Sequence, residues 1–275
     1  MSARAVPPGA VPARVCAQRE GRLAERPDWL ADEVPVALVV EGGSQAVMLA
    51  TPADLEDFAL GFALTEDWIA RADELYAVET VHTAQGIELQ LELAASRRWA
   101  LRERRRALAG RTGCGLCGVE SLAQVERPLP AVQAPHLAPG ALARALRELA
   151  QQQPLNALTG AVHAAAWCAL DGAVRLVRED IGRHNALDKL VGAMARAGAR
   201  PGEGFVAVTS RASFEMVHKA AAAGVGLLAA VSAPTARAVQ TADRCGLVLA
   251  GFVRGEDAVF YGAAAATRWP QGAAA

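Results

Sequence analysis

The sequence predicts a layered α/β protein with a smaller N-terminal α+β domain. Beyond residue 159, apolar runs typical of strands alternate with amphipathic segments typical of helices, the pattern of a partly parallel sheet covered by helices. Before residue 100, strand patterns surround one strong helical pattern. A composition with 52% hydrophobic but only 5% aromatic residues fits such a closely packed fold and argues against disorder.

The N-terminal elements follow from hydrophobic periodicity and turn residues. Gly42-Gly43 predicts a turn between two apolar strands. A helix is expected to begin at Thr51-Pro52, with Thr51 as its N-cap and Pro52 at the first helical position. The expected strands of this region are 36–40, 46–50, 74–83 and 87–93.

The C-terminal elements alternate in type. A helix with three leucines on one face is expected over 141–152. The expected strands after it are 161–170, 174–177, 205–209, 227–232, 247–253 and 258–261, with helices over 185–197, 214–223 and 235–244.

Composition shifts divide the chain into five segments. The first 28 residues hold four prolines among scattered arginines and lack the apolar stretch of a signal peptide, so a disordered tail is expected there. Prolines also mark a connector after the central cysteines. The expected segments are a tail over 1–28, a small α+β domain over 29–110, a cysteine loop and connector over 111–140, an α/β cofactor-binding domain over 141–262, and a tail over 263–275.

Charge and hydropathy exclude several classes of partner. Lys and Arg number 28 and Asp and Glu 29, so the net charge of −1 implies no general attraction to nucleic acid or to an anionic membrane. Glycines and a proline interrupt the longest uncharged run, 220–236, so no membrane insertion is expected. With no export signal, we expect a cytoplasmic protein whose thiols are reduced.

Cys114 and Cys117 form a CxxC pair in a glycine-rich segment. In a reducing compartment such a pair is typical of a redox or persulfide site, or of half a zinc site. The third interpretation is a glycine turn that happens to contain two cysteines. No second ligand pair is present, and no metal is expected. The arginines that end at Arg111 favour the reactive thiolate form.

Polar residues at strand-to-helix junctions predict a site for an anion. The stretch 178–185 lies between a strand and a helix, where α/β proteins place ligands. The stretch 209–213 combines hydroxyls, backbone amides and a guanidinium, which suit a phosphate or pyrophosphate. Helix capping explains several of these residues equally well. His163 is as consistent with a core position as with a functional one. The candidate cofactor-binding set is Arg178, Arg183, His184, Arg211, Ser213 and Arg254.

Several motifs follow one another along the chain: the segments 113–118, 159–165, 179–189, 210–217, 230–235 and 251–254, preceded by 33–35 and 51–62. In this order they resemble the formate dehydrogenase accessory sulfurtransferase family, FdhD. The resemblance covers about residues 30 to 262.

This resemblance implies a cytoplasmic sulfur carrier, a sulfurtransferase. Members take sulfur from a cysteine desulfurase as a cysteine persulfide. They pass it to the molybdenum bis(molybdopterin guanine dinucleotide) cofactor that formate dehydrogenase needs. By the family's motif, Cys114 carries the persulfide and Cys117 assists. The alternative is a cofactor chaperone that delivers the cofactor to the dehydrogenase without handling sulfur.

The resemblance also implies details of fold and binding. It suggests a homodimer, a three-layer C-terminal domain resembling the cytidine deaminase fold, and guanosine diphosphate as a mimic of the cofactor. The family's cofactor-contacting stretch falls on Phe252, Val253, Arg254, Gly255, Glu256 and Asp257. Family members often carry a basic residue near its end, where this chain has acidic ones. The deaminase signature itself is missing, so zinc hydrolase chemistry is not expected.

Overall fold

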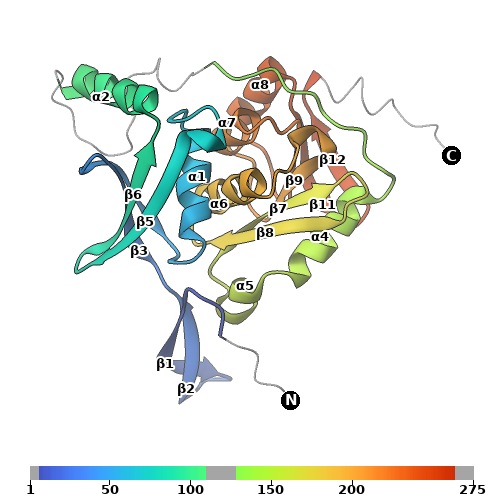
Figure 1. Cartoon of the computed structure of the whole chain (residues 1–275). Helices are drawn as coiled ribbons and strands as arrows, with labels where there is room; N and C mark the ends of the chain where they lie inside the picture. Colours follow the sequence, from blue (N-terminus) through green and yellow to red (C-terminus); the bar gives the residue numbers. More distant parts are fainter. Residues whose placement is uncertain (1–5, 110–127, 264–275) are drawn as a thin grey trace.

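The computed structural model describes residues 6–109 and 128–263. Cys114 and Cys117 lie outside the described residues. The described strands form three sheets: a two-stranded hairpin, a four-stranded sheet and a six-stranded sheet (Figure 1). None of the described helices combines the length and the apolar character needed to cross a bilayer.

The six-stranded sheet is the centre of the molecule. Its strand order is β12-β11-β10-β9-β7-β8. The middle strands β9, β10 and β11 run parallel to one another, whereas β7 pairs antiparallel with both β8 and β9. The bounds are β7 (His163–Ala169), β8 (Val174–Asp180), β9 (Gly204–Val208), β10 (Leu227–Ala230), β11 (Val248–Arg254) and β12 (Asp257–Tyr261).

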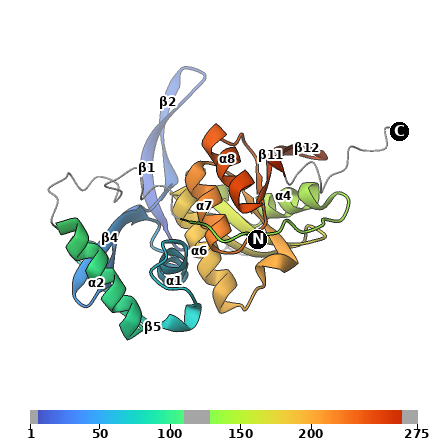
Figure 2. The ribbon, with the colours of Figure 1, turned by 90° about the horizontal axis from the view of Figure 1, so that it is seen from above.

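Helices cover both faces of this sheet. One hydrophobic cluster joins helices α6, α7 and α8 to alternate residues of the strands, and these helices lie side by side in Figure 2. A second cluster joins α4 to the opposite face. The layered α/β class predicted from the sequence is confirmed. The bounds are α4 (Ala141–Gln151), α5 (Pro154–Thr159), α6 (Arg183–Arg196), α7 (Phe214–Ala222) and α8 (Ala236–Cys245).

The four-stranded unit, residues 34–109, packs beside this layered body. Its strand order is β4-β3-β6-β5, and helix α1 packs its apolar residues against the sheet. The arginine-rich segment lies in helix α2. The bounds are β3 (Val34–Val40), β4 (Gly43–Ala50), α1 (Leu55–Thr65), β5 (Leu75–Thr83), β6 (Gly86–Leu93) and α2 (Ala95–Ala109), with short 3-10 turns at Ala72–Glu74 and Pro201–Glu203.

The start of α1 differs from the prediction. The helix begins at Leu55, and its N-cap is Asp54, whose φ of 53° is left-handed. Thr51 caps nothing, because its hydroxyl accepts a hydrogen bond from the backbone N–H of Ile181 in the layered body at 3.2 Å. The local sequence pattern predicts that Thr51 caps the helix, but in the folded protein its side chain makes a tertiary hydrogen bond instead.

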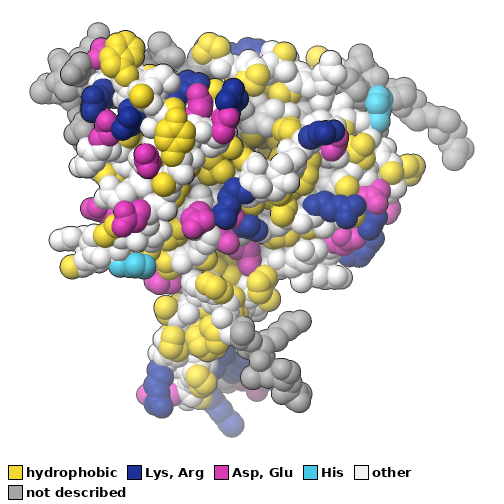
Figure 3. Space-filling model, in the orientation of Figure 1, with side chains coloured by type: hydrophobic (Ala, Val, Ile, Leu, Met, Phe, Trp, Pro, Cys, Tyr) yellow, Lys and Arg dark blue, Asp and Glu magenta, His cyan; other side chains and the backbone are white. Residues whose placement is uncertain are grey.

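The N-terminal segment also differs from the prediction of a tail over 1–28. Strands β1 (Ala10–Arg19) and β2 (Arg22–Ala31) form an antiparallel hairpin. It projects from the body beside α5 (Figure 1), and in Figure 3 Lys and Arg side chains gather near its tip. Pro12 and Pro27 are compatible with it, because a strand with an unpaired edge needs fewer backbone donors.

Helices α1 and α6 approach each other closely through two glycines. A Cβ atom on Gly61 would collide with the carbonyl oxygen of Asp188, and one on Gly192 would collide with the carbonyl oxygen of Asp57. The absence of side chains at these positions lets the two backbones touch. This contact joins the four-stranded unit to the layered body.

We predict that Gly61→Ala lowers the free energy of unfolding by roughly 1–3 kcal/mol, the usual cost of overpacking. The direction of this change is informative, because alanine is a better helix former than glycine and would otherwise be expected to stabilise the helix. Urea unfolding measures it. Gly202→Ala is the control, since no atom lies within 4 Å of its added Cβ. An equally stable Gly61→Ala protein would contradict the close contact.

Candidate functional site

The candidate site lies at the edge of the six-stranded sheet where the parallel strands end. At this edge, the residues that follow β9 and β10 lie beside the last residues of β11, the first residue of β7 and the last residue of β8. The backbone N–H of Thr209 donates to the carbonyl of Ala164 at 3.1 Å, and that of Phe252 donates to the carbonyl of Ser232 at 3.3 Å. Such an edge is where open α/β sheets place ligands.

Two helices begin at this edge with their first backbone donors uncapped by side chains. Gly182 is the N-cap of α6 and Ser213 the N-cap of α7, and neither makes a side-chain capping hydrogen bond. His184 on α6 lies 2.8 Å from the carboxylate of Glu215 on α7, which places the two helix starts side by side. Backbone N–H groups and the positive ends of two helix dipoles therefore converge.

Two polar side-chain atoms at these helix starts are buried without a partner. Nε of Arg183 and Oγ of Ser213 make no hydrogen bond to any described residue. Buried polar groups in proteins are nearly always hydrogen-bonded, so an orphaned pair calls for an explanation. A guanidinium and a hydroxyl at two helix N-termini are the groups that bind phosphate.

Neighbouring charges shift the pKa values of two titratable groups at this edge. Burial lowers the pKa of His163, and the nearby charges of Arg183 and His184 lower it further. On the other side, His184 and then Arg183 hold the pKa of Glu215 below its ordinary value. The Glu215 carboxylate therefore faces the permanent cation of Arg183 as well as the imidazole of His184.

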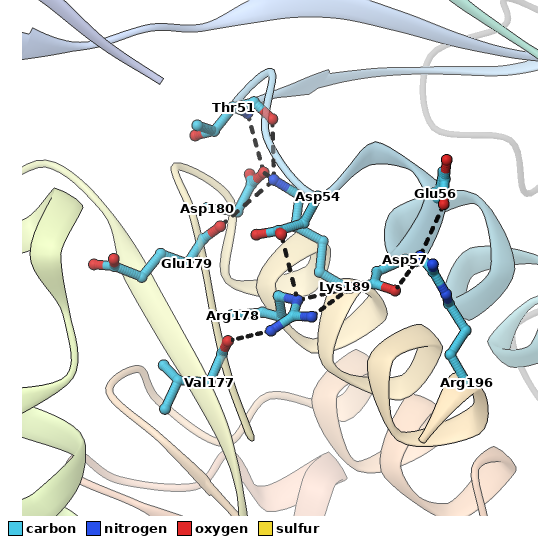
Figure 4. A network of polar contacts seen from close by, with 10 residues as sticks. All are labelled: Thr51, Asp54, Glu56, Asp57, Val177, Arg178, Glu179, Asp180, Lys189 and Arg196. Atoms are coloured by element: carbon cyan, nitrogen blue, oxygen red, sulfur yellow. Dashed lines mark hydrogen bonds and ion pairs between the residues drawn. The ribbon is translucent and has the colours of Figure 1, made fainter. Parts of the chain in front are cut away.

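A buried network fixes the loop that carries Arg183 and His184. Lys189 and Asp180 have fully buried side chains, and Nζ lies 2.6 Å from Oδ2 (Figure 4). Lys189 also donates to the carbonyl of Thr51 at 3.0 Å, and the N–H of Thr51 donates to Asp180 at 3.0 Å. Oδ1 of Asp180 accepts from the N–H of Gly182 at 2.8 Å and from Nδ2 of Asn185 at 3.0 Å. The four-stranded unit therefore helps to shape the site.

Arg178 lies among carboxylates at the start of α1. It belongs to β8 and pairs with Asp57 at 2.6 Å and with Asp54 at 3.6 Å (Figure 4). Arg196 pairs with the same Asp57 at 3.1 Å. These residues line a hollow of about 710 Å³ at the start of α1. Carboxylates already offset the charge of Arg178, whereas Nε of Arg183 is left without a partner among the described residues.

The other predicted residues spread along the same edge. Arg211 is exposed two positions before Ser213. Phe252 lies near the end of β11, and Arg254, the last residue of that strand, is opposite Asp257 in the strand register across the tight β11–β12 turn that contains Gly255 and Glu256. In the part of the chain that the structure describes, no three His, Cys, Asp or Glu side chains gather as a metal site.

The described thiols differ in setting. Burial raises the pKa of Cys168 to about 12, and burial also raises the pKa of Cys245. These two stay protonated at neutral pH and make poor nucleophiles. Cys16 is exposed on the hairpin.

Sequence reasoning missed Glu215 and the roles of Thr51 and Lys189. Glu215 lies two residues after a predicted anion-binding serine, but nothing in the sequence links it to His184. Lys189 lies among apolar residues in a predicted helix, a pattern that indicates a buried charge. The sequence spacing does not reveal that its partner is Asp180, at the end of β8.

We predict that Arg183→Ala raises the pKa of His163, because it removes a cation that disfavours the imidazolium. The C2 proton resonance of His163, followed by NMR against pH, measures this pKa; Arg175→Ala, on an exposed part of β8, is the control. Since the pKa of His163 in the folded chain lies below its unfolded value of 6.5, stability falls as the pH drops below about 6.5. An unchanged midpoint in Arg183→Ala would show that Arg183 does not face His163.

We predict that Lys189→Met lowers the free energy of unfolding by roughly 3–5 kcal/mol, because it leaves the Asp180 carboxylate buried without its cation. Urea unfolding measures the loss. Adding Asp180→Asn should recover part of it, since no charge then stays buried. Arg200→Met breaks an exposed pair with Glu203 and should change stability by less than about 1 kcal/mol. Equal losses for both cations would refute the buried pair.

Known proteins resemble this chain over most of its length. The FdhD/NarQ family matches residues 31–267. A sulfur carrier protein FdhD of Variovorax paradoxus is 60% identical over 85% of this chain and 84% of its own. Another, of Xanthomonas axonopodis pv. citri, is 51% identical over 94% of this chain and 93% of its own.

A solved structure shows the same fold. The crystal structure of a protein from Desulfotalea psychrophila superposes with a TM-score of 0.71 at 23% identity, covering 92% of this chain and 96% of the other. The family match and the curated relatives together establish the assignment expected from the ordered motifs: the chain belongs to the FdhD/NarQ family.

Proposed function

We propose that this protein is a sulfur carrier that serves formate dehydrogenase by sulfurating its molybdenum bis(molybdopterin guanine dinucleotide) cofactor. The curated relatives named above as sulfur carrier proteins support the transfer of sulfur. The observation that carries the cofactor part is the buried, unpartnered Nε of Arg183 and Oγ of Ser213 at two helix starts. A guanine dinucleotide supplies a pyrophosphate, the anion that such donors suit.

The proposed sulfur donor is a cysteine desulfurase that holds a persulfide. The thiolate of Cys114 attacks the outer sulfur of that persulfide, the sulfur–sulfur bond breaks, and the donor's inner sulfur leaves as a thiolate. Cys114 then carries the persulfide, and Cys117 lies three residues further along the chain. The pKa values of buried Cys168 and Cys245 support assigning the chemistry to the CxxC pair.

The proposed cofactor contacts are narrower than the predicted set. Arg183, His184 and Ser213 form the centre, and exposed Arg211 and the stretch 252–257 lie further along the same edge. Arg178 contributes by bracing α1, since Asp57 and Asp54 hold its guanidinium. Guanosine diphosphate is the simplest soluble mimic of the cofactor's nucleotide end. A cytoplasmic location and a homodimer complete the proposal.

The second candidate is a chaperone that carries the cofactor without handling sulfur. It is favoured by one observation: among the described residues, α6 and α7 by themselves supply the unsatisfied donors proposed to bind the anion. This candidate requires normal activation of formate dehydrogenase by the protein lacking both thiols.

We predict that purified protein gains one sulfur atom when incubated with a cysteine desulfurase and cysteine, and that reductant removes it. Intact mass spectrometry measures the gain. Cys114→Ala should abolish loading, whereas Cys16→Ala, which removes the exposed hairpin thiol, should load normally. Loading of Cys114→Ala would overturn that residue's role. No loading of the parent by an active desulfurase would favour the chaperone.

A further inference from the structure

Helix α2 concentrates positive charge in a chain whose net charge is close to zero. It contains six arginines and one glutamate, Glu103. Nε of Arg97 lies 2.9 Å from the carboxylate of Glu74. The carboxylate of Glu41 pairs with two further arginines of the helix, at 3.6 and 2.6 Å. These three carboxylates balance half of the six arginines, so the helix is a cationic element on the surface of the four-stranded unit.

The side of α2 that points away from the core carries Trp99. Leu101 belongs to the cluster formed with α1 and the four-stranded sheet and is 7% exposed. Trp99 lies two positions earlier, about 200° around the helix, and is 64% exposed. Its ring therefore adds nothing to the core. Tryptophan and arginine are the residues most enriched at the energetic centres of protein interfaces, and α2 presents both.

The place of α2 in the chain brings it close to the thiol that the proposed function uses. The helix ends at Ala109, and Cys114 is five residues further along, a length of chain that spans at most roughly 18 Å. An interface of ordinary size covers about 800 Å² of each partner, a patch roughly 30 Å across. A protein that brings its own sulfur to Cys114 therefore reaches α2 with the same surface.

We propose that α2, with Trp99 at its centre, is the docking surface for the protein that donates the sulfur. The inference rests on the proposed function and adds the place where the donor binds. The donor's matching surface is acidic, with an apolar patch for the tryptophan ring, and lies beside its persulfide. Complementary charge of this kind speeds the encounter and orients the two proteins. Figure 3 shows Lys and Arg side chains gathered over α2, with hydrophobic ones among them.

The sulfur acceptor is expected at a different surface. The proposed cofactor contacts lie at the starts of α6 and α7, in the layered body. Helix α2 belongs to the four-stranded unit. Because the two surfaces lie on different units, loss of the α2 surface should impair the loading of sulfur and leave binding of the cofactor's nucleotide end unchanged.

The initial rate of sulfur loading, measured on the full-length protein by intact mass spectrometry at increasing concentrations of a cysteine desulfurase, tests the proposal. Trp99→Ala should raise the half-saturating concentration of desulfurase about tenfold, the effect of losing a central interface residue, and leave the rate at saturation unchanged. Arg102→Ala should raise the same concentration, with a larger effect at low ionic strength, because salt screens exposed charges.

Two matched variants and a second sulfur donor are the controls. Leu23→Ala and Arg14→Ala remove an exposed apolar and an exposed cationic side chain from the hairpin, and both should load as the parent does. Cysteine persulfide needs no docking surface, so it should load all four variants at the parent's rate. The urea midpoint of Trp99→Ala should equal that of the parent, since its ring lies outside the core.

Other results would overturn the inference, and they point to different causes. An unchanged dependence on desulfurase in Trp99→Ala and Arg102→Ala moves the donor away from α2 and leaves the proposed function standing. Equal slowing with desulfurase and with cysteine persulfide shows that α2 acts on the thiol itself. Normal loading with impaired activation of formate dehydrogenase assigns α2 to the acceptor. A parent protein that neither donor loads removes the sulfur-carrier function, and the docking surface falls with it.

Discussion

The buried ion pair between Lys189 and Asp180 is the interaction on which the arrangement of the site depends. Removing two charges from water costs several kcal/mol, and the pair is stable only if its remaining hydrogen-bonding capacity is satisfied. Backbone groups of Thr51 supply both an acceptor for Lys189 and a donor for Asp180. The pair is therefore complete only when the four-stranded unit is docked, and the loop that leads into α6 takes its shape from both units.

The arginines of this region illustrate how partners decide a role. Arg178 and Arg183 are separated by only five positions and were equal candidates for binding an anion. Arg178 forms ion pairs with Asp54 and Asp57, so its charge stabilises the contact between α1 and β8. Arg183 begins a helix and retains a buried donor that no described residue satisfies. Of these two guanidinium groups, that of Arg183 is the one with a buried N–H left unsatisfied among the described residues.

Much of the fold was predictable because most elements carry their own signal. The alternation of strands and helices after residue 159 was expected, and so was a helix over 235–244. Thr235 is the N-cap of this helix, α8, and accepts a hydrogen bond from the N–H of Ala238 at 3.2 Å. The predictions that were wrong concern Thr51 and the N-terminal hairpin. Thr51 binds Ile181 instead of capping α1, and the hairpin over 10–31 has weak alternation that its prolines obscure.

The site was predictable in part for the same reason. Arg183, His184 and Ser213 lie at strand-to-helix junctions, an address that the sequence shows. The convergence of these residues with Glu215 and His163 depends on how β7, β8 and β9 are ordered in the sheet, which no local pattern reveals.

Helix α6 contacts both halves of the molecule. Its first turn belongs to the candidate site, its middle presents Gly192 to α1, and its last turn carries Arg196, which pairs with Glu56 and Asp57. A ligand that binds at the first turn and strengthens the docking of α1 is itself bound more tightly, by the same free energy, when α1 is docked. Amide hydrogen exchange in α1 would consequently report on events at the opposite end of α6.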